Sequence, residues 1–81
     1  MADQDPILER IRRLADEEHA LRERESHGGL PEEERLRLSA VELELDQTWD
    51  LLRQRRARRD AGLDPEDART RDPDTVENYQ Q

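Results

Sequence analysis

The sequence predicts an all-α protein whose framework is an antiparallel two-helix hairpin of the coiled-coil type. Two long stretches repeat their apolar residues at the 3.6-residue spacing of an amphipathic helix. The paired glycines Gly28 and Gly29 separate the two stretches, and such a pair ends one helix and permits a tight turn before the next. A polar C-terminal segment follows, and we expect it to be only partly ordered.

The first helix is predicted from about residue 6 to about residue 25. Asp5 is a favourable N-cap, and Pro6 suits the first helical position because its missing N–H would have no partner there. One face of this helix is apolar and the opposite face is charged. The apolar members of that face are Ile7, Leu8, Ile11, Leu14, Ala15 and Leu21.

The second helix is predicted from about residue 31 to about residue 61. Pro31 is followed by three glutamates, and carboxylates in a first turn are stabilised by the helix dipole. Arginines crowd the last two turns, where positive charge is favourable, and Gly62 can supply a left-handed C-cap. A helix of about 30 residues would be roughly 45 Å long.

The second helix carries two apolar stripes on nearly opposite sides, and therefore needs two partners. The main stripe packs against the first helix in a short antiparallel hairpin. We interpret Trp49 as an anchor of this core, with a role at an interface as the alternative, because Trp is often a hot-spot residue. The predicted hairpin core consists of Ile7, Ile11, Leu14, Leu21, Leu38, Val41, Leu45, Trp49 and Leu52.

The second stripe predicts a homodimer. No other segment of the chain is judged large enough to cover this stripe, whereas a second copy of the hairpin is. Two hairpins joined in this way would form a four-helix bundle. The predicted dimer face consists of Leu36, Ala40, Leu43, Gln47 and Leu51.

The chain divides into a helical hairpin at residues 1–62 and a C-terminal tail at residues 63–81. The Asp64-Pro65 pair repeats the pattern of an N-cap and a helix start, which favours a short helix at about residues 65–70. Val76 and Tyr79 are apolar residues that can dock as a pair.

Composition limits the function classes. The chain has 81 residues, of which 31% are hydrophobic and 44% are charged, and its net charge is −8. Such a short chain has little material for a core, and without cysteine it has no disulfide to stabilise it. No stretch approaches the roughly 20 apolar residues of a membrane span, and no secretory leader is recognisable, so we expect a cytoplasmic protein.

Five arginines near the end of the second helix form a candidate contact with phosphate or with a partner: Arg53, Arg55, Arg56, Arg58 and Arg59. Arginine binds phosphate through two parallel hydrogen bonds, but arginines also stabilise a helix C-terminus without any ligand. In an antiparallel hairpin Asp3 and Asp5 would lie near Arg55 and Arg56 and neutralise part of the run. No aromatic side chains interrupt it for base stacking. Nucleic-acid binding is therefore retained only as an alternative.

No residues predict catalysis, a metal site or a cofactor site. His19, Glu23 and His27 are spaced four apart, which would align three ligands on one helix, but His27 falls at the helix end. Ser26 and Ser39 lack the surrounding motif of a nucleophile. We expect a protein that is not an enzyme.

The stretch "ELDQTWDLLRQRRARRDAGLDPEDARTR" (residues 44–71), preceded by "ILERIRRLADEEHALR" (residues 7–22), resembles a family of small uncharacterised actinobacterial proteins. Their signature resembles L-D-Q-x-W-D-L-L-R-Q-R-R-A followed by A-G-L-D-P. Because the family is a domain of unknown function, the resemblance implies no catalytic or binding residues.

These observations together favour a non-catalytic helical module for protein–protein interaction or for small-scale regulation. The alternative is a regulator that binds nucleic acid or a nucleotide through the arginine-rich end of the second helix.

Overall fold

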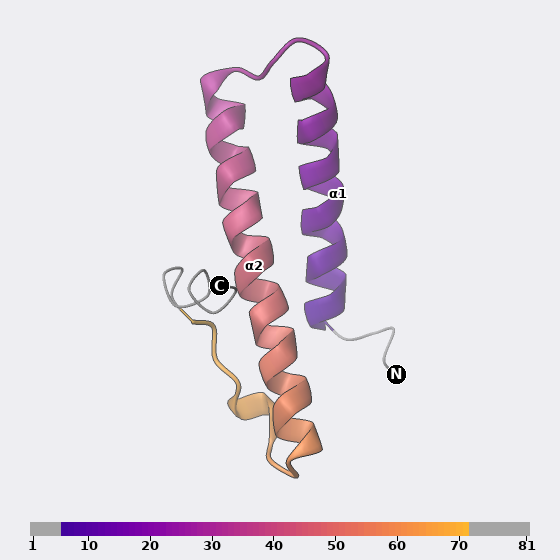
Figure 1. Ribbon diagram of the computed structural model, residues 1–81, viewed down its shortest axis with the longest axis vertical. Coiled ribbons are helices and arrows are strands. Elements are labelled where there is room, and N and C mark those ends of the chain that lie inside the picture. The colour runs from indigo at the N-terminus through magenta and orange to yellow at the C-terminus, as the bar shows by residue number, and fades with distance from the viewer. Residues whose placement is uncertain (1–5, 72–81) are drawn as a thin grey trace.

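The computed structural model describes residues 6–71, and within them the chain is entirely helical or irregular. Helix α1 (Pro6–Ser26) and helix α2 (Glu32–Asp60) lie side by side and antiparallel, and a short 3-10 helix, η2 (Pro65–Asp67), packs against the end of α2 (Figure 1). The all-α hairpin prediction is confirmed for these residues. Because α2 is eight residues longer than α1, with 29 residues against 21, its last turns extend beyond the start of α1.

Local backbone signals end both long helices. The N–H of Gly29 donates to the carbonyl of Glu25 at 2.9 Å, and Gly29 has a φ of 85°, which favours glycine. At the end of α2 the N–H of Leu63 donates to the carbonyl of Arg58, and the N–H of Gly62 donates to that of Arg59. This pair of bonds is a Schellman motif, with Gly62 in the left-handed region at a φ of 76°.

The core lies along the seam between α1 and α2. Its positions on α2 are residues 38, 41, 45, 48 and 52. These spacings alternate between three and four residues, which is the pattern of a coiled-coil seam. Val41, at the centre, is completely buried. Ile7 and Leu8 are half-buried and pack against the cluster. The buried apolar residues are Ile11, Leu14, Leu21, Leu38, Val41, Leu45 and Leu52.

The prediction that Trp49 is a core anchor is wrong, because Trp49 is 41% exposed. The core position between Leu45 and Leu52 belongs to Thr48, which is only 2% exposed. The Thr48 hydroxyl donates to the carbonyl of Glu44 at 2.7 Å, so its polar group is satisfied in the seam. Trp49 is rotated about 100° further around the helix, which places the indole at the edge of the seam.

Ion pairs line both edges of the seam. On one edge Arg10 pairs with Glu44 at 3.3 Å, and Glu17 pairs with Arg37. Arg24, which is seven residues after Glu17, pairs with Glu34 on this same edge, and Arg22 pairs with Glu42 on the other edge. Exposed pairs of this kind contribute little to stability individually. They do favour one register of α1 against α2, because a shift along the seam would separate all four at once.

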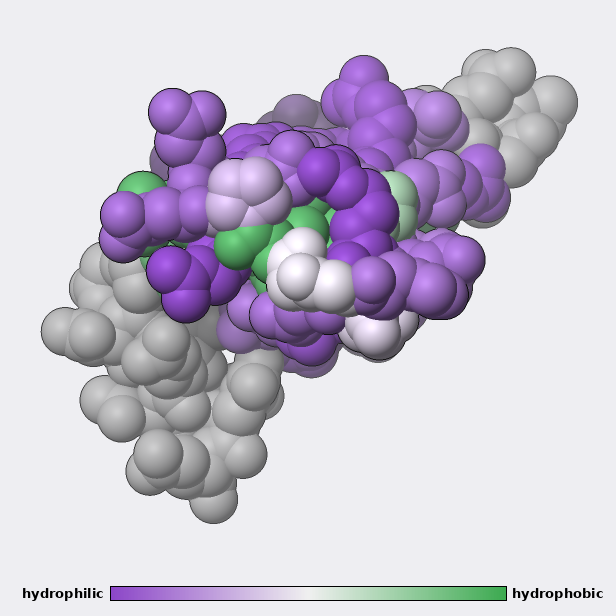
Figure 2. Space-filling model, turned by 90° about the horizontal axis from the view of Figure 1, so that it is seen from above, coloured by the Kyte–Doolittle hydropathy of each residue, from purple (hydrophilic) through white to green (hydrophobic). Residues whose placement is uncertain are grey.

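Seen from the end that carries the loop between the helices, the described surface is mostly hydrophilic, with a small apolar area near its middle (Figure 2). Hydrophilic side chains surround that central area, and further apolar atoms show at the margin of this view. Within residues 6–71, neither long helix is apolar enough over a sufficient length to cross a membrane.

Candidate functional site

The five arginines of α2 do not form a single patch. Successive residues on a helix are about 100° apart, so a run within seven positions surrounds the helix. The structure pairs Arg55 with Glu66 at 3.0 Å, and Arg58 with Asp67 at 3.4 Å. Arg58 also donates from Nε to the carbonyl of Asp64 at 2.7 Å. Acidic residues of the C-terminal segment thus neutralise two members of the run.

The partners predicted for the arginine run, Asp3 and Asp5, lie outside the described residues. Arg53, Arg56 and Arg59 are exposed. Arg53 and Arg56 are three residues apart and lie on one side of α2, whereas Arg59 is rotated further around the helix and Arg55 and Arg58 are paired elsewhere. The structure therefore does not bring the predicted phosphate-contacting residues together.

The C-terminal segment folds back along α2, and we call residues 63–71 the strap. Gln54 holds it with both ends of its amide: Nε2 donates to the carbonyl of Arg69 at 2.6 Å, and Oε1 accepts from the N–H of Arg69 at 3.3 Å. Two turns further back, Gln47 donates to the carbonyl of Arg71 at 3.2 Å. The strap therefore runs antiparallel to α2, held by side chains that bind its backbone.

Beneath the strap lies Asp50, which sequence reasoning missed and which is 2% exposed. Its carboxylate accepts a hydrogen bond from Gln54 at 2.9 Å and faces the guanidinium of Arg71 at 3.5 Å. These side chains, with Arg53 and Ala57, line a small groove of about 90 Å³. A carboxylate this well buried needs such partners, and the strap supplies the positive one. No periodic signal in the sequence marks Asp50, because its partner is 21 residues away.

The strap corrects the argument that no other part of the chain can cover the second stripe of α2. Gln47 and Leu51 are half-buried on the side where the strap passes. Leu43 is also half-buried, whereas Ala40 is exposed and Leu36 is 66% exposed. The half of the stripe nearest the C-terminus of α2 is therefore covered by the same chain, and the half nearest the loop between the helices is open.

A second exposed surface of α2 is centred on Trp49, and we call it the Trp49 edge. It consists of Glu42, Asp46, Trp49, Arg53 and Arg56. Spacings of three, four and seven residues place them along one side of the helix. Glu42 binds Arg22 across the seam, so one heptad further from the loop Trp49 lies across from the small residue Ala15. A small neighbour leaves the indole open.

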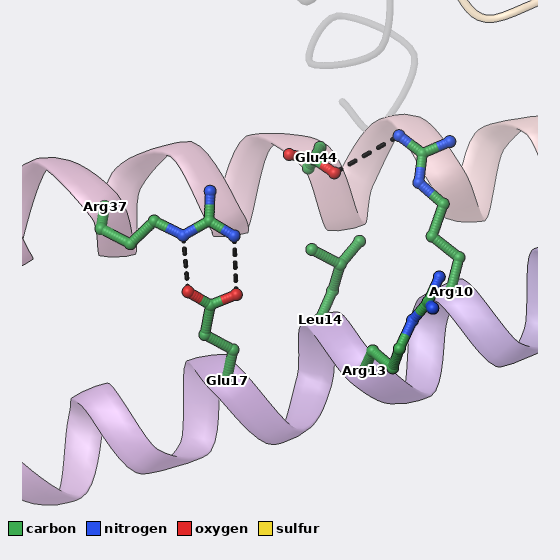
Figure 3. Close-up of a pocket in the computed structure, with 6 residues that line it drawn as sticks. All are labelled: Arg10, Arg13, Leu14, Glu17, Arg37 and Glu44. Atoms are coloured by element: carbon green, nitrogen blue, oxygen red, sulfur yellow. Dashed lines mark hydrogen bonds and ion pairs between the residues drawn. The ribbon is translucent and has the colours of Figure 1, made fainter.

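A larger groove, with a volume of about 310 Å³, lies on the opposite edge of the seam (Figure 3). It is lined by Arg10, Arg13, Leu14, Glu17, Arg37 and Glu44. Glu17 accepts two hydrogen bonds from Arg37, at 2.5 and 2.6 Å, and this contact lowers the pKa of Glu17 and raises the pKa of Arg37. A carboxylate held in its charged form in this way is a poor proton acceptor.

The histidines do not meet at a common point. His19 contacts the carboxylate of Glu23 at 3.6 Å, but the Nδ1 of His27 donates to the backbone carbonyl of Glu23 at 2.7 Å. The Ser26 hydroxyl donates to the same carbonyl at 2.8 Å. His27 thus helps to cap the end of α1, and no group of three or more metal-ligating side chains occurs within residues 6–71.

Comparisons with known proteins place the chain among uncharacterised ones. An uncharacterized protein of Mycobacterium tuberculosis (strain ATCC 25618 / H37Rv) is 55% identical over 73 residues, which are 89% of this chain and 84% of the relative. An uncharacterized protein of Mycobacterium bovis is similar to the same extent. No solved structure matches the chain. Residues 3–81 match a family described as "Protein of unknown function (DUF2630)", and the chain belongs to that family.

Proposed function

We propose that the protein is a non-catalytic helical interaction module, and that it pairs with a second copy of itself through the Trp49 edge. The observation that carries the proposal is the 41% exposure of Trp49 in a chain that has one Trp and no Phe. A sequence this poor in large apolar residues leaves its largest one at the surface. Exposed aromatic side chains of this kind are enriched at the centres of protein–protein interfaces.

The charges around Trp49 support a second copy as the partner. Toward the loop, the edge carries the acidic residues Glu42 and Asp46, and toward the C-terminus of α2 it carries the basic residues Arg53 and Arg56. A two-fold axis through Trp49 would place the acidic half of one copy against the basic half of the other. Such a surface is self-complementary, which is the requirement for a symmetric dimer.

The position of Trp49 on a long, rigid helix also fits this arrangement. Two copies of α2 crossing at Trp49 would stack or offset their indoles, and each indole would cover the other's open face. The covering side chains would come from a helix already held rigid by α1, so little further conformational entropy is lost on association.

Light scattering across a range of protein concentrations tests the proposal. We expect wild-type chains to associate into dimers and Trp49→Ala to shift the equilibrium to monomer by at least about tenfold, with helicity by circular dichroism retained. Leu63→Ser is the matched control, because Leu63 is 53% exposed but lies on the strap, away from this edge. Association of Trp49→Ala equal to that of the wild type would contradict the proposal.

A charge swap tests the orientation of the two copies. A two-fold axis through Trp49 places position 46 of one copy near position 53 of the other. Asp46→Arg and Arg53→Asp should therefore each weaken association, and a mixture of the two single variants should restore it as a heterodimer. In a parallel experiment, the binding of a double-stranded oligonucleotide to the wild-type protein is measured at several salt concentrations. Tight binding of the oligonucleotide without dimer formation would favour the nucleic-acid alternative, if the logarithm of the binding constant falls linearly with the logarithm of the salt concentration.

A further inference from the structure

The groove that contains Glu17 and Glu44 holds hydrogen-bond donors that no described residue uses. Glu17 occupies the Nε and one terminal nitrogen of Arg37, and Glu44 occupies one terminal nitrogen of Arg10. Arg13 lines the same groove and has no ion pair with any of residues 6–71 (Figure 3). A guanidinium has five N–H donors, so those of Arg13 are available to a ligand.

The charges around this groove leave a positive excess. Three arginines and two glutamates line it, so its net charge is +1. The hydrogen bonds from Arg37 lower the pKa of Glu17, which keeps that carboxylate charged and engaged with its partner. Arg10 and Arg13 are three residues apart and project from the same side of α1. Like charges at this spacing repel each other, and an anion between them removes the repulsion.

The floor of the groove is apolar. Leu14 is 6% exposed and points into the groove between the two ion pairs (Figure 3). A volume of about 310 Å³ is at the lower end of the range for ligand sites, roughly 300–1,000 Å³, so the groove admits one side chain rather than a large cofactor. A side chain with a short apolar stem and an anionic end would cover Leu14 and reach Arg13.

We infer that the groove binds an acidic side chain of a protein partner, with Arg13 as the main contact of its carboxylate and Arg10 beside it. A single carboxylate matches the net charge of +1, whereas a phosphate group with nearly two negative charges would be repelled by Glu17 and Glu44. Salt screens charges beyond about 8 Å under physiological conditions, so the groove rather than the net charge of −8 governs the approach of the carboxylate.

This site goes beyond the proposed pairing with a second copy. The groove lies on the edge of the seam opposite the Trp49 edge, so it stays open when two copies pair there. The binding of an acidic partner therefore does not depend on the dimer.

A nuclear magnetic resonance titration of the full chain with a short peptide tests the inference. The probe is a hexapeptide with blocked ends and two adjacent glutamates between leucines, and in the control peptide both glutamates are glutamines. We expect the acidic peptide to shift the Nε–H signals of Arg10 and Arg13 and the backbone amide of Leu14. The control peptide should leave them unchanged. Equal shifts from the two peptides, or no shift with the acidic one, would overturn the inference.

Two neighbouring arginines provide a matched pair of variants, and both are exposed. Arg13→Gln should weaken binding of the acidic peptide about three- to tenfold, because it removes the main contact. Arg12→Gln removes the same charge, but Arg12 does not line the groove and pairs with Glu9 at 3.7 Å, so binding should be unchanged. An equal loss in both variants would mean that net charge attracts the peptide, and would contradict the inference.

Other occupants of the groove are recognised in the same titrations. Inorganic phosphate that shifts the Arg13 signal at a lower concentration than the acidic peptide would contradict the inference, because the site would then select phosphate. A shift of the Arg13 signal with protein concentration alone would contradict it too, because a second copy would then fill the groove.

One further variant separates this inference from the proposed pairing. Trp49→Ala should bind the acidic peptide as tightly as the wild type does, because the indole lies on the other edge of the seam. Light scattering on the same samples reports on pairing at the Trp49 edge. Failure of one proposal can therefore be told from failure of the other.

Discussion

At the scale of single residues, two neighbours on α2 have opposite surroundings. Thr48 is 2% exposed and Trp49 is 41% exposed, although Trp is by far the more apolar. The spacing of the seam decides this, because positions three residues after Leu45 and four before Leu52 face α1. Position in the seam therefore overrides side-chain hydrophobicity here.

This difference predicts a ranking of stabilities. Leu52→Ala should lower the free energy of unfolding by about 2–5 kcal/mol, because Leu52 is 3% exposed and its truncation leaves a cavity in the seam. Trp49→Ala should lower the free energy of unfolding by only about 1–2 kcal/mol, because much of the indole already faces water. Urea unfolding measures both, at concentrations low enough to keep the chain monomeric. A larger loss for Trp49→Ala than for Leu52→Ala would mean that the indole belongs to the core.

Glu17 predicts an acid-dependent loss of stability. The hydrogen bonds from Arg37 lower the pKa of Glu17 from its ordinary value of 4.5, so the folded state favours the charged carboxylate. The stabilisation is complete above pH 4.5 and is lost as the pH falls through the lower, folded-state pKa. Glu17→Gln should therefore lower the melting temperature slightly near neutral pH and leave it unchanged at strongly acid pH. Thermal melts of both proteins across that range provide the measurement, and a difference that persists in acid would exclude this explanation.

At the scale of elements, the helices and the strap differ in how far the sequence predicts them. The Gly62 stop is a local signal, and the structure places Gly62 just past α2; the predicted Asp5 cap lies outside the described residues. The strap has no such signal. It is held by Gln47 and Gln54, which bind its backbone, and amide side chains that do this look the same in sequence as solvated ones.

Gln54→Ala should loosen the strap without unfolding the hairpin. It removes both hydrogen bonds to the backbone of Arg69, each worth about 0.5–1.5 kcal/mol. Hydrogen exchange should speed up by roughly tenfold at the amide of Arg69 while the amides of the seam stay protected. Arg56→Ala, an exposed change on the same helix, is the control and should leave the strap unaffected. Equal exchange in Gln54→Ala and wild type would show that other contacts hold the strap.

At the scale of the whole molecule, the sequence predicts the pairing of two helices but not what covers their outer sides. Apolar periodicity identifies which faces of α2 need a partner, and Leu36 and Leu51 belong to the same stripe. It cannot tell a partner chain from a polar strap of the same chain, because the strap contributes backbone groups rather than an apolar face. The inference that the second stripe requires another copy assumed that no segment of the same chain covers it. The strap covers the half of the stripe nearest the C-terminus of α2, so that half needs no second copy.

The net charge of −8 predicts how salt affects the proposed dimer. If the two net charges lie about 30 Å apart, their repulsion in water is roughly 9 kcal/mol without screening, about 3 kcal/mol at 0.01 M salt and well under 1 kcal/mol at 0.15 M salt. The few exposed ion pairs across the Trp49 edge contribute only about 0.2–1 kcal/mol each, so the fall in repulsion has the larger effect on how dimerisation depends on salt. Sedimentation equilibrium should therefore show tighter dimerisation as salt rises from low to physiological concentration, by about tenfold or more. Arg56→Glu, which adds negative charge, should steepen this dependence, and dimerisation that instead weakens with salt would mean that ion pairs, rather than the indole of Trp49, hold the two copies together.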